Sequence, residues 1–207
     1  MTTALYILAA LLVGFALGRY RASSIQNRGE ALVARTLGGN FAGPDYHLMN
    51  HLTLPLKDGT TQIDHILVSR FGVFVIETKD YNGWIFANPK QSQWTQVFFK
   101  KKFRFQNPIF QNIRHVRAVQ ELLDFLPPEA VQSVVVFTGN AEFRTEVPDG
   151  VFSARQVVEH LRGQRTEVMS TNRVQFCVGR LETARLAISR NTDVEHVRSL
   201  QRRHGAA

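Results

Sequence analysis

The order of apolar and polar positions along the chain predicts alternating strands and helices. The predicted strands are short apolar or alternating runs bounded by turn residues: 45–54, 61–68, 73–79, 83–87, 94–106 and 131–139. The predicted helices have apolar residues three or four positions apart: 26–37, 109–126, 153–161 and 171–190. A helix, a group of strands, a second helix and a further strand, in that order, predict an α/β fold with a mixed β-sheet flanked by helices.

The segment TQIDHILVSRFGVFVIETKD, residues 61–80, is predicted to be a β-hairpin, because only SRFG separates its two apolar runs. Its second strand is apolar on both faces yet ends in Glu77 and Lys79, charges that are costly to bury unless something pairs or uses them. A two-residue loop would place Asp64 opposite Glu77 on one face. A loop of three residues would place them on opposite faces, and the apolar pattern fits either register.

Two carboxylates on one face repel each other unless a cation bridges them, so the two-residue loop predicts a metal site at Asp64 and Glu77. Lys79 would share that face and could orient a metal-activated water, and the backbone carbonyl of Thr78 offers another hard oxygen. Oxygen ligands of this kind suit Mg²⁺ or Mn²⁺. The alternative is a solvated strand end, with Asp64 paired to a basic residue, and the spacing alone does not decide between the two.

The net charge of the chain predicts the kind of partner that it binds. The chain has 25 Lys and Arg against 17 Asp and Glu, a formal charge of +8, which favours nucleic acid or an anionic membrane surface. Basic residues that could bind phosphates interleave with phenylalanines or lie on the second helix: Lys100, Lys101, Lys102, Arg104 and Arg114. The alternative is a charged strand edge and a solvated helix face. The single Cys177 excludes a disulfide framework and a multi-cysteine zinc module.

Residues 4–18 carry no charge and are followed by Arg19 and Arg21. We expect a single-pass membrane anchor near the short limit of bilayer-spanning helices. The positive-inside rule then places residues 20–207 in the cytoplasm, at the inner membrane. A cleaved signal peptide, which would want a basic start that is missing here, and an interfacial helix are the alternatives. The predicted organisation is an anchor at 1–20, a core domain at 21–140 and a helical extension at 141–207.

Several blocks, in this order between Arg28 and Gly139, resemble the nuclease-related domain (NERD) family: RGEALVARTL, IDHILVSRFGVFVIETKDYNGWI, WTQ and FQNPIFQNIRHVRAV. That family is placed among the PD-(D/E)xK, restriction-endonuclease-like folds. The resemblance implies that Asp64 and Glu77 bind the metal and that Lys79 is the catalytic lysine. It also implies that Glu30 in the first helix adds a metal contact and that Gln111 lies beside the site.

The resemblance implies a Mg²⁺- or Mn²⁺-dependent nuclease that hydrolyses phosphodiester bonds of nucleic acid, DNA before RNA, at the membrane. The alternative is a membrane-bound module that binds nucleic acid or protein without cleaving; the intact acid, acid and lysine set favours the enzyme. His65 and His115 are expected to be hydrogen-bonded histidines rather than ligands or bases. Trp84 and Trp94 are expected to anchor the core.

Overall fold

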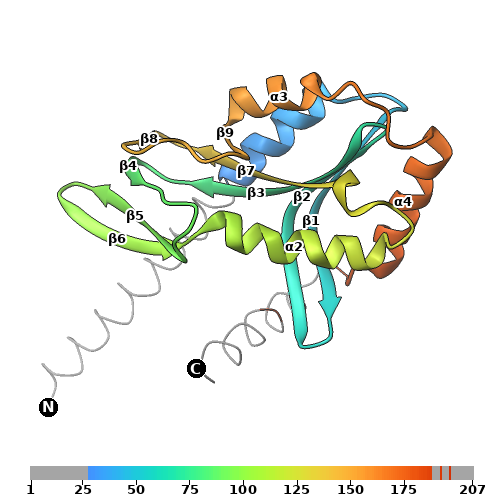
Figure 1. Ribbon diagram of the computed structural model, residues 1–207, viewed down its shortest axis with the longest axis horizontal. Helices are drawn as coiled ribbons and strands as arrows, with labels where there is room; N and C mark the ends of the chain where they lie inside the picture. The colour runs from blue at the N-terminus through green and yellow to red at the C-terminus, as the bar shows by residue number, and fades with distance from the viewer. Residues whose placement is uncertain (1–27, 188–191, 193–195, 197–207) are drawn as a thin grey trace, which may run out of the picture.

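The computed structural model describes residues 28–187, Thr192 and His196, and its central element is a five-stranded sheet (Figure 1). The strand order is β1-β2-β3-β7-β9, with β1 to β3 antiparallel and with β7 and β9 parallel to β3. The strands are β1 (Tyr46–Leu56), β2 (Gly59–Ser69), β3 (Gly72–Asp80), β7 (Val131–Thr138) and β9 (Val151–Ser153). The predicted mixed α/β fold is confirmed.

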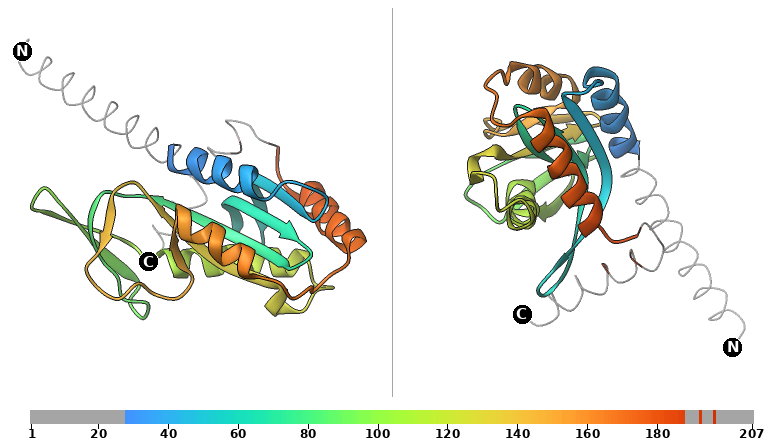
Figure 2. Two further views of the ribbon diagram at one scale, coloured as in Figure 1. Left: turned by 90° about the horizontal axis from the view of Figure 1, so that it is seen from above. Right: turned by 90° about the vertical axis from the view of Figure 1, so that its right-hand side faces the viewer.

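Helices cover both faces of this sheet. A helix over residues 28–40 and α3 (Ala154–Gly163) lie on one face, and Figure 2 shows them side by side in blue and orange. The helices α2 (Pro108–Leu122) and α4 (Thr171–Ala184) pack on the other. Asn107 caps α2 by accepting a hydrogen bond from the Ile109 amide. A short 3₁₀ helix, η1 (Pro128–Ala130), leads into β7.

The strand β3 separates two apolar cores, which explains its uninterrupted apolar run. Val73 and Val75 pack under α2 and α4, while Phe74 and Ile76 pack under α3 and the helix over residues 28–40. Residues 72–78 are all buried. A strand buried on both faces needs apolar side chains at every position, so Glu77 stands in a place where a charge requires partners.

A second sheet lies at one end of the first, at the left in Figure 1. Its order is β6-β5-β4-β8, with β8 parallel to β4. The strands are β4 (Gly83–Phe86), β5 (Gln93–Phe98), β6 (Lys101–Gln106) and β8 (Ala141–Phe143). One face of this sheet packs on the first sheet through a third core, in which Ile85 and Trp94 meet Phe137. Residues 141–184 therefore contribute to both sheets and to the helical layers.

Three expectations about these elements were wrong. Residues 94–106 form two strands, because Phe99 and Lys100 turn the chain with φ of 45° and 63°. No Gly or Asn marks this turn in the sequence, so the usual hairpin signal is missing. The helix predicted to reach residue 190 ends at Ala184, and the Leu186 amide then donates to the Thr53 carbonyl. Trp94 is buried as expected, but Trp84 is 45% exposed.

The expected anchor at 4–18 lies outside the described residues. Within the part of the chain that the structure describes, no helix is long and apolar enough to cross a bilayer.

Candidate active site

The β2–β3 hairpin closes through a two-residue loop, Arg70 and Phe71. Its paired residues run from Ser69 opposite Gly72 to His65 opposite Ile76. This confirms the register that the metal-site hypothesis requires and excludes the three-residue loop. The next position along each strand is Asp64 on β2 and Glu77 on β3, at the point where the ladder ends.

Asp64 lies where β1 and its own strand, β2, depart from the regular alternation of side chains between the two faces of the sheet. In β1 the residue between the paired Asn50 and Leu52 is His51, whose φ is 54°. In β2, Ile63 and Ile66 face the same core although they are three residues apart. The Asp64 carboxylate therefore reaches across to β3, where its Oδ2 accepts a hydrogen bond from the Thr78 amide at 2.7 Å.

Thr78 contributes only its backbone to this side of β3. The amide and carbonyl of one strand residue point toward the same neighbouring strand. Because the Thr78 amide binds Asp64, the Thr78 carbonyl also faces the gap between β2 and β3. The Thr78 carbonyl, which the sequence predicts to be an oxygen ligand, thus faces the same gap as the Asp64 carboxylate.

Glu77 is 2% exposed, and basic groups approach both of its oxygens. Lys79 Nζ lies 2.6 Å from Oε1, and His115 Nε2 lies 3.2 Å from Oε2. Lys79 also donates to Gln111 Oε1 at 2.9 Å, and His115 Nδ1 lies 2.7 Å from Thr61 Oγ1. The structure thus brings Glu77, Lys79 and Gln111 together, as the resemblance implies.

The next residue of α2, Asn112, fixes this helix to the sheet. Its fully buried amide nitrogen lies 2.9 Å from the Val75 carbonyl and 3.1 Å from the Val134 carbonyl. It also lies 2.9 Å from Ser133 Oγ. One side chain therefore contacts β3 and β7 together, directly beside the residue that binds Lys79.

Glu30 approaches the site because Gly29 lets its helix come very close to the sheet. A Cβ at Gly29 would lie 2.6 Å from Thr138 Oγ1 and 2.7 Å from the Asp80 Cβ, at the ends of β7 and β3. Only glycine fits there. Glu30 is half-buried, and burial raises its pKa, while the nearby charges of His51, Glu77 and Lys79 also act on it.

The pKa shifts in this cluster reflect both burial and the charges of neighbouring groups. Burial and then the nearby Glu77 and Glu30 raise the pKa of Asp64 well above its ordinary value. Burial alone would raise the pKa of Glu77, but Lys79 and His115 outweigh it and hold that pKa low. Burial would lower the pKa of Lys79, yet Glu77 outweighs it and raises that pKa. The Glu77–Lys79 pair is thus charged at neutral pH, while Asp64 retains its proton to a higher pH than an ordinary aspartate.

The sequence predicted only a hydrogen-bonded histidine at His115, whereas the structure places it in this cluster, against Glu77. His115 follows Gln111 by four residues on α2, a spacing that places both side chains on one face of the helix, and this signal could have found it. His65 meets the expectation of a hydrogen-bonded histidine, because its Nδ1 lies 2.7 Å from Asn50 Oδ1. Burial lowers the pKa of His65 to about 4, so its ring is neutral near pH 7.

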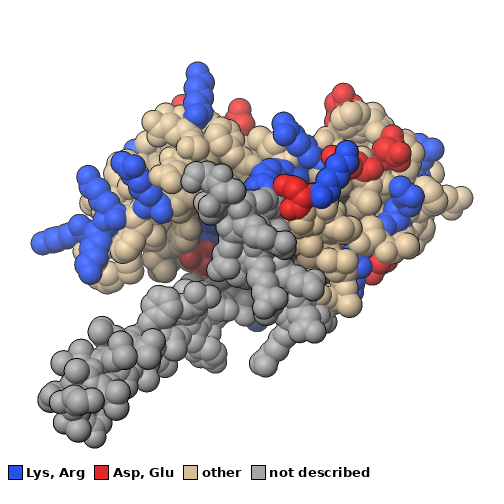
Figure 3. All heavy atoms as spheres, turned by 90° about the horizontal axis from the view of Figure 1, so that it is seen from below, with Lys and Arg blue, Asp and Glu red and all other residues tan. Residues whose placement is uncertain are grey.

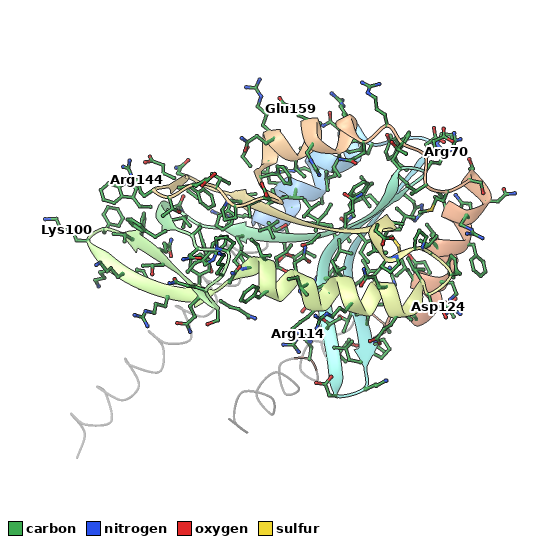
Figure 4. The ribbon with its side chains drawn as sticks, in the orientation of Figure 1. Arg70, Lys100, Arg114, Asp124, Arg144 and Glu159 are labelled. Atoms are coloured by element: carbon green, nitrogen blue, oxygen red, sulfur yellow. The ribbon has the colours of Figure 1, made fainter. Side chains whose placement is uncertain are left out.

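The predicted nucleic-acid-binding residues lie on the surface, outside this cluster. Figure 4 shows Lys100 at the tip of the β5–β6 hairpin and Arg114 on the outer side of α2. Lys101, Lys102 and Arg104 are exposed along β6. Among the described residues, no group of three or more His, Cys, Asp or Glu side chains is already arranged around a common metal position. Lys79 and His115 instead lie against the oxygens of Glu77.

Comparison with known proteins identifies the family to which this chain belongs. The sequence profile of the nuclease-related domain family matches residues 25–138, more than half of the chain, so this chain belongs to the nuclease-related domain family. An uncharacterized protein of Bacillus anthracis is 44% identical over 97 residues. The match covers 46% of this chain and 45% of that protein, so the chain matches less than half of that relative's length. No solved structure matches this chain.

Proposed function

We propose that this chain is a metal-dependent nuclease that hydrolyses phosphodiester bonds in nucleic acid, DNA before RNA. One observation carries the proposal. Glu77, buried and paired with Lys79 at 2.6 Å, ends a core strand beside Asp64, where β2 and β3 separate. A buried Glu77 beside the partly buried Asp64 and Lys79 costs stability, so the presence of this set is best explained by a use in chemistry. Membership of the nuclease-related domain family supports this reading.

The oxygen donors of the cluster fit Mg²⁺ or Mn²⁺. Asp64, Glu77 and the Thr78 carbonyl would hold the ion, and Glu30 would add a carboxylate from its helix. Burial, and then Glu77 and Glu30, raise the pKa of Asp64, and a cation bound beside this carboxyl would favour loss of its proton. When bound, the ion would polarise a phosphate oxygen and favour formation of a nucleophile from water.

Lys79 is suited to an electrostatic role. Its pKa is raised, so at neutral pH its ammonium is charged and donates hydrogen bonds but accepts no proton. Glu77 and Gln111 hold this charge in one place at 2.6 Å and 2.9 Å. A fixed ammonium beside a phosphate offsets the negative charge that develops during hydrolysis. His115 would hold the second oxygen of Glu77 in position.

The test is cleavage of a labelled DNA by the purified full chain with Mg²⁺ or Mn²⁺. Glu77→Gln and Lys79→Ala are each expected to reduce the cleavage rate by at least about 100-fold. Arg155→Gln is the matched control, because this α3 residue has a 90% exposed side chain. Cleavage that continues at an unchanged rate in both site variants would overturn the proposal.

A second candidate is a nucleic-acid- or protein-binding module that does not cleave. The observation that favours it is the approach of Lys79 and His115 to the two oxygens of Glu77. The two candidates differ in metal binding. For the nuclease, millimolar Mn²⁺ should raise the melting temperature of the full chain, and Asp64→Asn should abolish that increase. A melting temperature unchanged by Mn²⁺ would favour the module.

We also propose that residues 4–18 anchor the chain in the cytoplasmic membrane, with residues 20–207 on the cytoplasmic side. The support is the uncharged apolar run and the arginines that follow it. Full-length chain should therefore sediment with membranes and require detergent for extraction. Recovery in the supernatant without detergent would contradict the anchor.

A further inference from the structure

The outer face of the second sheet combines aromatic and basic side chains. Opposed residues of neighbouring strands point to the same face, and the register aligns Trp84 with Val97 and Val97 with Lys102. The adjacent row on that face aligns Phe86, Thr95 and Arg104. The opposite face carries Ile85 and Trp94, which are buried against the first sheet.

Trp84 and Phe86 are exposed although they are large and apolar. Trp84 is 45% exposed and Phe86 is 40% exposed. They are two residues apart on one strand, so their Cα atoms are about 7 Å apart on a common face. The Arg144 guanidinium lies 4.4 Å from the centre of the Trp84 ring. Flat rings at this spacing, with a stacked guanidinium, are suited to contact with nucleobases.

A polar hollow of about 430 Å³ continues the same face. It is lined by Gln91, Ser92, Gln93, Thr95 and Arg104. Thr95 is also the strand neighbour of Phe86, so the hollow adjoins the aromatic row. Amide and hydroxyl groups beside an aromatic surface can bind the edges of a base that stacks on it. This volume lies within the usual range of ligand sites, ~300–1,000 Å³.

Positive charge surrounds these rings. Lys102 and Arg104 lie on the same face, and Lys100 and Lys101 are at the hairpin tip. Figure 3 shows Lys and Arg side chains gathered at this end of the molecule. Glu142 opposes Trp84 from β8, but its carboxylate lies 3.4 Å from Arg144. The face thus has a net positive charge that suits a phosphate backbone.

The chain connects this face to the acid cluster at both ends. β4 begins three residues after β3 ends, and β6 is followed at once by α2, which carries Gln111. Gln96 Nε2 donates to the Asn82 carbonyl at 2.7 Å and holds β5 against this connection. Short connections therefore join the second sheet to the elements that carry Glu77, Lys79 and Gln111.

We propose that the outer face of the second sheet binds single-stranded nucleic acid, with bases stacked on Trp84 and Phe86 and phosphates on Lys102 and Arg104. The inference rests on the proposed nuclease function and names its substrate class as unpaired strands. Duplex nucleic acid presents no free base faces to these rings. An anionic membrane would match the charge, but it gives no role to the polar hollow beside Phe86.

The test measures binding by the full chain in EDTA, so that no divalent ion is available. The probes are a fluorescein-labelled oligothymidylate and its duplex with oligoadenylate, followed by fluorescence anisotropy. Trp84→Ala is expected to weaken oligothymidylate binding about tenfold, because the variant loses the ring on which a base stacks. Trp84→Phe should restore most of the affinity. Phe176→Ala is the matched control, since this α4 ring is 56% exposed and lies on a different layer.

The charged residues give a second readout. Lys102→Gln should reduce the salt dependence of oligothymidylate binding by about one counterion, whereas Arg155→Gln on α3 should leave it unchanged. Equal affinities of Trp84→Ala and Phe176→Ala for oligothymidylate would overturn the proposal. Tighter binding of the duplex than of oligothymidylate would also overturn it. So would a Trp84→Ala variant that loses binding to phosphatidylserine vesicles but keeps its affinity for oligothymidylate.

These outcomes are separable from the fate of the proposed function. Binding without divalent ions does not depend on the acid cluster, and every variant in this experiment lies outside that cluster. If Trp84→Ala binds oligothymidylate as well as Phe176→Ala while cleavage still depends on Glu77, only the single-strand face is rejected. If Trp84→Ala binds more weakly as expected but Glu77→Gln leaves cleavage unchanged, only the nuclease assignment is rejected.

Discussion

The two sheets place their exceptional residues in opposite environments. The first sheet buries charge: Glu77 and Lys79 end a strand that is otherwise apolar and enclosed by helices. The second sheet exposes apolar rings: Trp84 and Phe86 face solvent beside basic residues. Each arrangement costs stability, since charges favour water and large apolar side chains favour the interior. Under the proposed function, the first sheet would serve the chemistry and the second would contact the substrate.

The largest expected effect comes from dividing the buried ion pair. Lys79→Met leaves Glu77 buried without its lysine, and we expect the free energy of unfolding to fall by about 3–5 kcal/mol. The double variant Glu77→Gln/Lys79→Met removes both charges and should recover most of that loss. Urea denaturation of the unsubstituted chain, of Glu77→Gln and Lys79→Met alone, and of the double variant gives the coupling. If the losses in free energy of unfolding of the two single variants add up in the double variant, the two charges do not interact and are hydrated. The first sheet would then not bury charge, and its contrast with the second sheet would disappear.

A smaller effect is expected at the junction of the sheets. Gly139 has φ of +71°, and a Cβ there would lie 2.5 Å from the Tyr81 carbonyl oxygen. Gly139→Ala should therefore lower the free energy of unfolding by about 2–3 kcal/mol, measured by urea denaturation.

Gly150→Ala is the control for backbone strain alone. Gly150 has φ of +78°, but its added Cβ would meet the Ser133 carbonyl oxygen only at 3.5 Å. We expect a loss of about 1 kcal/mol there. An equal loss at the two glycines would mean that the close contact at Gly139 relaxes freely, and that the second sheet moves relative to the first.

The last expected effect is on the reactivity of Cys177, which measures how completely the core of the first sheet excludes reagents in solution. Burial raises the pKa of its thiol to about 11, so little thiolate forms at pH 8. Reaction with a disulfide reagent, followed by absorbance, should be at least about 100-fold slower in the native chain than in urea. Its native rate should keep rising with pH toward about 11. Complete native labelling within seconds at pH 8 would contradict a closed core.

The sequence predicted the first sheet better than the second. Long apolar runs and one family resemblance located β2, β3, β7 and α2, together with Asp64, Glu77, Lys79 and Gln111. The two possible hairpin registers could not be separated, because a strand that is apolar on both faces fits its neighbour in either. The turn at Phe99 and Lys100 was missed, because those residues adopt positive φ without glycine or asparagine.

Contacts between distant segments were also beyond the sequence pattern. The approach of Glu30 depends on Gly29 meeting Thr138 and Asp80, which are far away in the chain. The exposure of Trp84 depends on the face of the second sheet to which it points, whereas a tryptophan in an apolar run is ordinarily expected in the core. The role of His115 required knowing that α2 lies over Glu77.

Asn112 has a consequence for how the site would respond to its ligands. Its amide nitrogen lies within 3.1 Å of carbonyls on both β3 and β7, so α2 has one favoured position along the sheet. Gln111 and His115 on the same helix are therefore aligned with Lys79 and Glu77 as soon as the chain folds. The entropy of ordering these groups is lost during folding rather than at binding, which leaves the site preorganised. Under the proposed function, binding of an ion or a phosphate there should proceed with little movement of the backbone.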